Sequence, residues 1–563
     1  MLVGLYLTAK IQKKCYSTKA FSDIYCNFAL LKFLFLKMGH LVDLVLTPRQ
    51  ASDMSYIRKA TALQACVKSD MISDFRIVRK SIDARSREPK IMLSVEYFVV
   101  GEQVTMAYPK PQYCDVHNAK RSVIIVGSGP AGLFAALQLL ELGIKPIVLE
   151  RGKEVSDRKI DIAQLNRNNG LNVESNYCFG EGGAGTFSDG KLYSRSKKRG
   201  NIQRVMEIFH YHGAADSILY EAHPHIGSDR LPQIIKHMRQ AILDCGGEVR
   251  FRHRVEGLIL KDGRVCGCRV SDERNIVSDR YADAVILAIG HSAHDTYRML
   301  EAEGVRLEAK GFALGVRVEH PQSLIDNLMY HGAARGEYLP AASYSLVTQV
   351  DGRGVYSFCM CPGGHIVPAS SQKESCVVNG MSASRRNSSY ANSGIVVEIH
   401  PEDLPDRYKS ALGALRYQEE LEHLAWLHGA KESAIVQAAP AQRLLDFVNG
   451  IESKKLPKCS YLPGIVPSRL DLWLPEIVGK RLQQGFRDFD KKYRGFLTNE
   501  AVIVGVESRS SSPIRIPRDR ETMQHVDICG LYPCGEGAGY AGGITSSAMD
   551  GINAACAIGE ILK

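Results

Sequence analysis

The sequence of 563 residues contains no Cys-x-x-Cys pair, although it has 15 cysteines. Closely paired cysteines and histidines are the usual ligands of structural zinc, and no such spacing occurs in this chain. An odd number of scattered cysteines, mostly in apolar or strand-like segments, is also untypical of a disulfide framework. We therefore expect a reducing compartment, mostly buried thiols and no bound metal.

Long hydrophobic runs are missing as well. The most apolar stretch, Phe28–Leu36, is interrupted by Lys32, and it is far shorter than the roughly 20 apolar residues that a membrane-spanning helix needs. We expect no integral membrane span. Residues 1–37 are rich in lysine and aromatic residues, and no small-residue cleavage site follows the apolar stretch. A clear strand-and-helix pattern begins after Met38, so we expect Met38 to be the natural start and residues 1–37 to be an upstream extension.

An extreme charge is absent too, since the net charge is +10 and the isoelectric point is near 8.8. The chain is 45% hydrophobic and 23% charged, which is typical of a globular protein of about two to four domains. This balance favours an anionic small-molecule ligand over nucleic acid. The densest basic run, Arg195–Arg199, is either a solvated loop or a docking patch for an anionic substrate or redox partner.

Residues 38–115 show the pattern of a small α+β module. Thr47 followed by Pro48 is typical of a helix start, and the helix would run to about Val67. Strand patterns occur at Val42–Leu46, Phe75–Ile82 and Ile91–Val100, and a stiff linker follows at Tyr108–Gln112. The module contains no recognisable catalytic residues, so we expect a packing or partner-binding role.

A strand, a glycine turn, a helix and a second strand follow one another in residues 122–151. The β-branched run Val123–Val126 predicts a strand buried on both faces. In the turn Gly127-Ser-Gly-Pro-Ala-Gly132, Gly127 permits the sharp bend, Gly129 lets the backbone approach phosphates, and Gly132 allows close helix packing. The helix begins near Pro130 and Ala131, where its free N–H groups would face a pyrophosphate.

The second strand ends in an acid, Glu150, followed by Arg151. Glu150 lies 18 residues after Gly132, close to the roughly 20 expected for an acid that hydrogen-bonds a ribose. A carboxylate there also repels a 2′-phosphate, which argues against NADP at this site. With strand, turn, helix and acid in register, the segment predicts a dinucleotide site.

A second glycine cluster, Phe179–Lys191, holds five glycines in thirteen residues. A loop with so few side chains either has unusual dihedral angles or lies against a flat ligand. We expect its residues Gly182, Gly183, Gly185 and Thr186 to contact the far side of the pyrophosphate and the edge of a flavin. A flexible surface loop is the alternative.

Two further segments extend the predicted site. Glu248–Leu260 has the pattern of one strand, in which Val255 is placed to pair its backbone with adenine. Ala282–Gly290 is a buried strand that ends in Gly290 and is followed by His291 and His294. These histidines are either proton shuttles near a flavin or ordinary residues of a loop and helix start.

The C-terminal residues predict a return of the chain to the same fold. A strand is followed by Gly535 and Glu536, a turn through Gly542, Gly543 and Ile544, and a helix from near Thr545 to the end. We expect Glu536 to face the ribityl chain or pyrophosphate. The helix start would direct its positive end toward the flavin. An NAD-only domain has no need of this return, so the pattern favours FAD.

Only one Gly-x-Gly-x-x-Gly, at 127–132, stands between two predicted strands at the start of a helix, which argues for one flavin-binding fold with an inserted substrate domain. We expect residues 120–309 and 521–563 to form the FAD-binding domain and residues 310–520 the substrate or cap domain.

In the inserted part, Cys359 and Cys361 should point to opposite faces of a strand. They are either structural or one is a thiolate near the flavin. A polar segment could bind an anionic substrate or be a solvated loop; it contains Asn379, Arg385, Arg386, Asn387 and Asn392.

Four motifs together resemble a poorly characterised family, the FAD-dependent or NAD(FAD)-utilising dehydrogenases. They are the turn at 126–132, the glycine loop at 179–192, Tyr356–Gly364 and the Gly-Glu-Gly-Ala-Gly-Tyr-Ala-Gly-Gly-Ile stretch at 535–544. Shorter matches are Ser81–Arg85, Asn379–Ser382, Ala391–Ser393 and Ala439–Arg443. The resemblance covers about residue 40 to the end. It implies a Rossmann-like FAD-binding α/β fold of the glutathione-reductase type, in the bacterial cytoplasm or in plastids, and names no substrate.

The leading prediction is therefore an FAD-dependent oxidoreductase, a dehydrogenase or reductase that transfers a hydride between bound FAD and a small molecule, for which an anion is one candidate. NAD(P)H is a candidate transient electron donor. An FAD monooxygenase or a reductase of unsaturated bonds is the first alternative. A flavin-bound redox sensor or scaffold that acts through a protein partner is the second. The sequence predicts neither the substrate, the direction of electron flow nor the oligomeric state.

Overall fold

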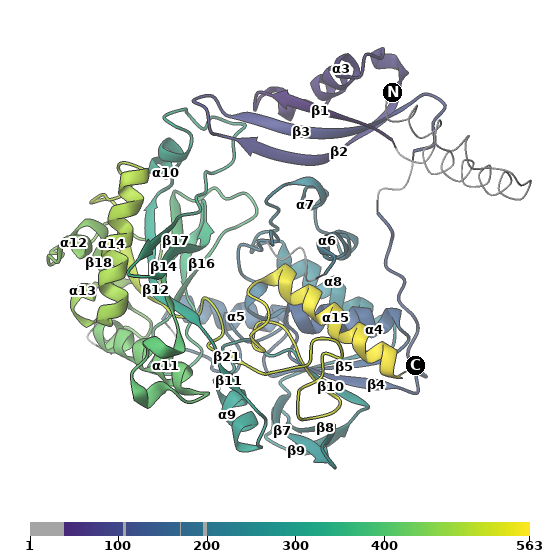
Figure 1. Cartoon of the computed structure of the whole chain (residues 1–563), viewed down its shortest axis with the longest axis vertical. Helices are drawn as coiled ribbons and strands as arrows, with labels where there is room; N and C mark the ends of the chain where they lie inside the picture. Colours follow the sequence, from purple (N-terminus) through teal and green to yellow (C-terminus); the bar gives the residue numbers. More distant parts are fainter. Residues whose placement is uncertain (1–38, 105–107, 169, 195–199, 432, 563) are drawn as a thin grey trace, which may run out of the picture. The chain divides into compact units, whose positions relative to one another are not determined.

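The computed structural model describes residues 39–104, 108–168, 170–194, 200–431 and 433–562 (Figure 1). The chain forms two compact units, of which the first contains the strands and helix before Pro109 and the second contains everything from Lys110 onward. The predictions about residues 1–37 and about the basic run 195–199 lie outside the described residues.

The described residues of the first unit form a three-stranded antiparallel sheet with one α-helix. Its strand order is β1-β3-β2, with bounds β1 His40–Leu46, β2 Ile72–Asp83 and β3 Lys90–Val99, and the helix is α3, Met54–Gln64. The predicted helix start at Thr47 is wrong. The carboxylate of Asp53 caps α3 by accepting from the backbone N–H groups of Ser55 and Tyr56, whereas the Thr47 hydroxyl accepts only from Gln50, at the start of a short 3-10 turn.

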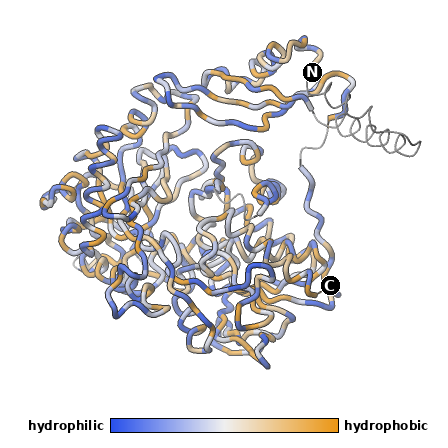
Figure 2. Tube along the Cα trace, in the orientation of Figure 1, coloured by the Kyte–Doolittle hydropathy of each residue, from blue (hydrophilic) through white to orange (hydrophobic). Residues whose placement is uncertain are grey.

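A five-stranded parallel sheet forms the centre of the second unit. Its order is β22-β10-β4-β5-β6, with bounds β4 Ser122–Val126, β5 Lys145–Glu150, β6 Glu248–Phe251, β10 Ala284–Leu287 and β22 Leu531–Pro533. Val123 and Ile125 belong to the hydrophobic core on one face, and Ile124 and Val126 to the core on the other. The predicted burial of this strand on both faces is confirmed, and its hydropathy can be followed in Figure 2.

Helices cover the central sheet, and α4, Pro130–Glu141, packs along the C-terminal helix α15, Ile544–Leu562 (Figure 1). A Cβ added at Gly551 of α15 would lie 2.0 Å from the carbonyl oxygen of Ala131, so the two backbones approach closely. The remaining helices of this part are α5 Val155–Asn166, α6 Ile202–Tyr211, α7 Ser217–Tyr220, α8 Leu231–Asp244 and α9 His294–Ala302. The C-terminal segment thus returns to the first fingerprint helix.

The predicted single strand Glu248–Leu260 is two strands in two sheets. β6 ends at Phe251, Arg252 has a φ of +57°, and β7 begins at Arg254. A left-handed residue breaks the extended ladder and redirects the chain. The second sheet is antiparallel, with bounds β7 Arg254–Lys261, β8 Arg264–Ser271 and β9 Val277–Tyr281.

The segment between β10 and β22 contains a larger mixed sheet. Its order is β13-β14-β17-β12-β20-β18-β19, with bounds β12 Phe312–Pro321, β13 Val347–Val350, β14 Arg353–Cys361, β17 Tyr390–Ile399, β18 Ala439–Arg443, β19 Ile465–Pro467 and β20 Val502–Glu507. The helices here are α10 Gln322–Met329, α11 Gly413–Trp426, α12 Leu444–Asn449, α13 Leu470–Trp473 and α14 Glu476–Lys492. Two short pairs complete it, β11 Glu308–Ala309 with β21 Ile514–Arg515 and β15 His365–Pro368 with β16 Val378–Met381. The second unit is therefore a mixed α/β fold.

Candidate functional site

A cavity of about 550 Å³ opens where the central parallel strands end. This is the edge at which open α/β sheets bind their ligands. Its lining includes these of the predicted site residues: Gly127, Gly129, Pro130, Ala131, Glu150, Arg151, Gly183, Gly185, Val255, Gly290, Glu536, Gly542, Gly543 and Ile544. The other predicted residues, Gly132, Gly182, Thr186 and Gly535, are not part of the lining. The fold thus brings together segments that are more than four hundred residues apart.

The glycine turn after β4 has the geometry that its sequence predicts. Gly127 has a φ of +102°, and a Cβ there would lie 2.7 Å from the carbonyl oxygen of Ala288. A Cβ at Gly132 would lie 2.0 Å from the oxygen of Gly127. Gly129 differs, because its backbone is extended and a Cβ would meet nothing nearer than Gly183 at 3.9 Å. The protein therefore leaves open space at Gly129, beside the start of α4, where no side chain caps the helix.

The second glycine loop lies against this turn. A Cβ on Gly183, whose φ is +62°, would lie 3.0 Å from the Cα of Gly129. Gly182 also has a positive φ, +77°, and its missing side chain makes room for the buried hydroxyl of Thr186. That hydroxyl donates to the carbonyl oxygen of Glu181, at 2.7 Å. Thr186 therefore stabilises the glycine loop from a position outside the cavity lining. The backbones of the two loops meet at the cavity.

The carboxylate of Glu150 connects the two glycine loops through hydrogen bonds. It accepts hydrogen bonds from the backbone and hydroxyl of Ser128 and from the N–H groups of Gly152 and Gly180, at 2.8–3.0 Å. Arg151 beside it pairs with Glu174 and Asp295. The observed contacts of Glu150 are thus to the protein itself, and its contact with a ribose stays a prediction.

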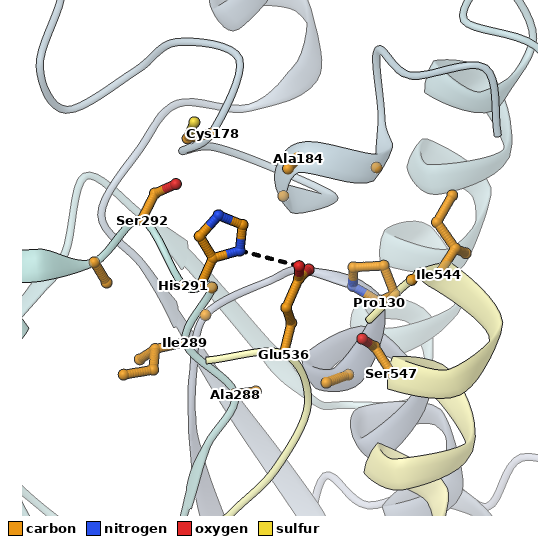
Figure 3. A pocket seen from close by; sticks show the side chains of 18 of the residues that line it. Pro130, Cys178, Ala184, Ala288, Ile289, His291, Ser292, Glu536, Ile544 and Ser547 are labelled. Atoms are coloured by element: carbon orange, nitrogen blue, oxygen red, sulfur yellow. Dashed lines mark hydrogen bonds and ion pairs between the residues drawn. The ribbon is translucent and has the colours of Figure 1, made fainter. Parts of the chain in front are cut away.

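An imidazole and a carboxylate of the cavity lining face each other (Figure 3). His291 Nδ1 lies 3.0 Å from Glu536 Oε1, and His291 Nε2 is buried without a hydrogen-bond partner. His294 is not part of the lining. It lies fully buried against Glu419, at 2.9 Å, and burial lowers its pKa. Of the two histidines that follow β10, only His291 is placed to meet a ligand.

Three glycines of the lining leave space that no protein atom fills. A Cβ added at Gly290, Gly542 or Gly543 would meet nothing within 4 Å. Gly542 and Gly543 immediately precede α15, whose positive end faces the cavity. Backbone without side chains beside a helix start suits a flat or anionic ligand that approaches closely.

The two thiols of the Cys-x-Cys segment point the same way. The prediction that they face opposite sides of a strand is wrong, because side chains two residues apart in a strand lie on the same face. The β14–β17 register also shifts between Phe358 and Cys361, and Cys359 has a φ of +46°. The ammonium of Lys191, from the glycine loop, donates to both sulfurs, at 3.7 Å for Cys359 and 3.5 Å for Cys361. Cys359 lines the cavity and Cys361 is fully buried behind it.

The charges around these thiols favour one thiolate. The hydrogen bond from Cys361 and the ammonium of Lys191 hold the pKa of the Cys359 thiol well below its usual value, against the effect of burial. The bond to Cys359 and burial raise the pKa of Cys361. Burial also raises the pKa of Asp189, but Lys191 and Arg386 lower it to about 2. Asp189 is therefore ionised and helps to fix the Lys191 ammonium.

Most side chains of the polar segment Asn379–Asn392, which the sequence suggests for an anionic substrate, bind other parts of the protein or lie exposed. Asn379 lines the cavity. Arg386 forms an ion pair with buried Asp189, and buried Asn392 accepts from Arg317 at 3.2 Å. Arg385 and Asn387 are exposed. Sequence reasoning missed Arg509, which lines the cavity and pairs with buried Glu422; its partner is distant in sequence and no motif marks either residue.

Within the described part of the chain, no group of three or more histidine, cysteine or acidic side chains is arranged to hold a metal ion. In the same part, every helix is too short or too polar to cross a bilayer.

Three family models match this chain. A domain of unknown function matches residues 38–98, an FAD binding domain matches residues 120–281, and the description "FAD-dependent protein, C-terminal domain-like" matches residues 311–510.

One relative, an uncharacterised protein of Clostridium beijerinckii, is 39% identical over 521 residues, which cover 89% of this chain and 95% of the relative. Among solved structures, a geranylgeranyl bacteriochlorophyll reductase-like protein of Thermoplasma acidophilum is 14% identical, covers 78% of this chain and 79% of its own, and gives a TM-score of 0.33. The flavin-dependent brominase Bmp2 is 11% identical over the same shares, with a TM-score of 0.35.

Proposed function

Because the chain belongs to a family of FAD-dependent proteins, we propose that it is an oxidoreductase in which bound FAD and a small molecule exchange a hydride. One observation carries the proposal. Both glycine loops, the start of β7 and the start of α15 line a single cavity at the carboxyl ends of the parallel strands. Among dinucleotide folds, this C-terminal return suits FAD rather than NAD alone.

The lining divides into parts that suit the parts of FAD. Glu150, Arg151 and Val255 would hold the adenosine end. The turn Gly127–Ala131 and the start of α4 offer backbone N–H groups to the pyrophosphate. The open backbone at Gly542 and Gly543 leaves room for the isoalloxazine ring. This order supports the proposal of a glutathione-reductase type of FAD fold, with residues 120–309 and 521–563 around an inserted domain at 310–520.

FAD supplies the two-electron hydride chemistry, and the residues of the chain supply position and charge. The first turn of α15 presents backbone donors to negative charge. His291, held at Nδ1 by Glu536, keeps Nε2 free to give or take a proton inside the cavity.

The substrate side of the cavity is lined by residues of the inserted part. Phe358, Cys359 and Asn379 come from this part and face the glycine loop that carries Lys191. An apolar ring, a thiolate and an amide around a buried ammonium suit a small molecule with both an apolar and a polar portion. We propose NAD(P)H as the transient donor of electrons for the other half-reaction.

Anaerobic mixing of the holoprotein with NADH or NADPH tests this function. We expect the visible absorbance of the bound flavin to bleach within the time of a turnover, before any other substrate is added. If the absorbance persists with both nucleotides, the NAD(P)H half-reaction is refuted. If NAD(P)H is consumed only when oxygen and an aromatic substrate are present, the protein is a monooxygenase instead.

A further inference from the structure

Cys359 and Cys361 lie at a break in the β14–β17 ladder. In a regular strand, side chains at residues i and i+2 share a face, but the rise of two residues, about 6.6 Å, keeps them apart. Here the ladder is broken by a bulge, and a left-handed φ of +46° at Cys359 re-aims its side chain. A positive φ at a residue with a side chain is uncommon and persists only where the surroundings hold it.

A buried arginine holds this bulge in place. Arg317 is fully buried, and its guanidinium donates to the carbonyl oxygen of Cys359 at 3.0 Å and to Glu507 at 3.0 Å. Its third contact is the side-chain oxygen of Asn392, at 3.2 Å. Breaking such a buried pair is costly, because it leaves an uncompensated charge. The unusual conformation of Cys359 is thus fixed by several elements rather than by its own strand.

The two sulfurs share one ammonium as their neighbour. Both lie within 3.7 Å of the same Lys191 nitrogen, and the thiol of Cys361 hydrogen-bonds to Cys359. Two residues of a strand span about 6.6 Å between Cα atoms, which lies within the range that a disulfide bridges. Cysteines 359 and 361 are free in this structure.

We propose that Cys359 and Cys361 form a redox-active dithiol, a second two-electron centre that exchanges electrons with FAD in the same cavity. The inference rests on the proposed function. In the forward step, the Cys359 thiolate and the Cys361 thiol form one S–S bond and break one S–H bond. They release two electrons and one proton, which the oxidised flavin takes up as a hydride equivalent, so that charge and atoms balance. The ammonium of Lys191 stabilises the thiolate before the step.

A third thiol of the cavity provides a matched control. Cys178 also lines the cavity (Figure 3). Its thiol donates to the carbonyl oxygen of Ala369 at 3.4 Å, and Arg509 contacts its sulfur at 3.7 Å. Replacing Cys178 removes one cavity thiol without touching the pair at Lys191.

Anaerobic reductive titration of the FAD-loaded protein measures the electrons taken up per FAD, and so the number of two-electron redox centres. For the oxidised wild type and for Cys178→Ser we expect uptake of about four electrons per FAD, and for Cys359→Ser and Cys361→Ser about two, because each removes the dithiol and leaves the flavin. A variant that still binds FAD in equal amount has kept its fold. Uptake of two electrons by a yellow wild-type protein overturns the dithiol and leaves the proposed function standing. A colourless wild type refutes the proposed function itself.

A second readout needs no flavin. Cleavage after Arg353 and Lys373 releases a peptide whose only cysteines are Cys359 and Cys361. After oxidation and blocking of free thiols, we expect this peptide to carry no blocking group and to be lighter by two hydrogens than its reduced form. Blocking groups on both cysteines after oxidation would overturn the proposal, as would a mixed population in which Cys178 replaces one partner.

Discussion

At the scale of single residues, Lys191 determines the chemistry of the cavity. It belongs to the glycine loop, yet its ammonium contacts sulfurs that lie about 170 positions later in the chain. Burial lowers the pKa of Lys191, but the two sulfurs and Asp189 raise it by more, so the side chain stays charged. The hydrogen bond from Cys361 and the charge fixed there lower the pKa of Cys359 and so favour its thiolate, and the thiolate is the reactive form of cysteine.

Alkylation of the FAD-free protein measures this effect. Cys359 should react with iodoacetamide at a rate that stays constant as the pH falls through neutrality, because its pKa lies below the usual value. Its reaction should slow only at a pH below that lowered pKa. In Lys191→Met, the pKa of Cys359 should rise because the ammonium is lost, so the rate should begin to fall at a higher pH than in the wild type, by about one pH unit for each pKa unit gained.

Cys556 is an internal comparison for the same experiment. It is exposed on α15, and burial of its sulfur together with Glu560 raises its pKa, so its rate should already fall as the pH drops below its usual range. If Cys359 follows the same pH dependence as Cys556, then Lys191 does not hold a thiolate.

The sequence could name Cys359 and Cys361 but could not orient them. Side chains at residues i and i+2 of a regular strand share a face, so the prediction of opposite faces was wrong. The observed conformation of Cys359 depends on a bulge that Arg317 fixes from another strand. Nothing local encodes that contact. Lys191 was visible as one of few side chains in a glycine-rich loop, which is a signal of function, but its partners were not.

At the scale of elements, the packing of α4 on α15 rests on glycine. Residues 131 and 551 touch through backbone, since a Cβ at Gly551 would lie 2.0 Å from the oxygen of Ala131. The helix contact therefore positions both helix starts, that of α4 for the predicted pyrophosphate and that of α15 for the predicted isoalloxazine ring.

A substitution there should separate the helices. Gly551→Val forces the two backbones apart, and we expect the free energy of unfolding to fall by about 2 kcal/mol, measured as a lower denaturation midpoint. The comparison variant is Gly479→Ala on the helix α14, where a Cβ meets nothing nearer than 3.8 Å. It should be neutral or stabilising by up to about 1 kcal/mol. Equal midpoints for the two variants would contradict the packing account.

Elements with strong periodicity were predictable, and breaks between them were not. The β4 strand, the glycine turn and the C-terminal helix follow from hydrophobic runs and glycine spacing. The break at Arg252 is a single left-handed arginine between two strand-like runs, and its residue type gives no warning. The cap of α3 was misplaced because Thr47 and Asp53 are both good caps, and only the tertiary structure selects between them.

At the scale of the whole molecule, the cavity is the place where distant segments meet. The turn after β4, the glycine loop, β7 and α15 contribute to its wall, so a ligand that fills it ties these segments together. A ligand that binds only the folded state adds about 2.7 kcal/mol of stability at 100 times its Kd.

FAD should therefore raise the thermal midpoint of the FAD-free protein in a concentration-dependent manner. Riboflavin lacks the adenosine and pyrophosphate that Glu150 and Gly129 would face, so the same concentration should raise the midpoint far less. An equal shift with both compounds would place the binding energy in the ring alone and would contradict the assignment of the two glycine loops.

The content of FAD in purified protein tests the central claim most directly. The wild type should be yellow and release close to one FAD per chain on denaturation. Gly129 has an extended backbone and open space beside it, so Gly129→Val should fold with an unchanged circular dichroism spectrum and yet hold almost no FAD, while Gly479→Ala keeps the wild-type amount. A folded Gly129→Val protein that retains its FAD, or a wild type that cannot take up FAD, would contradict the account.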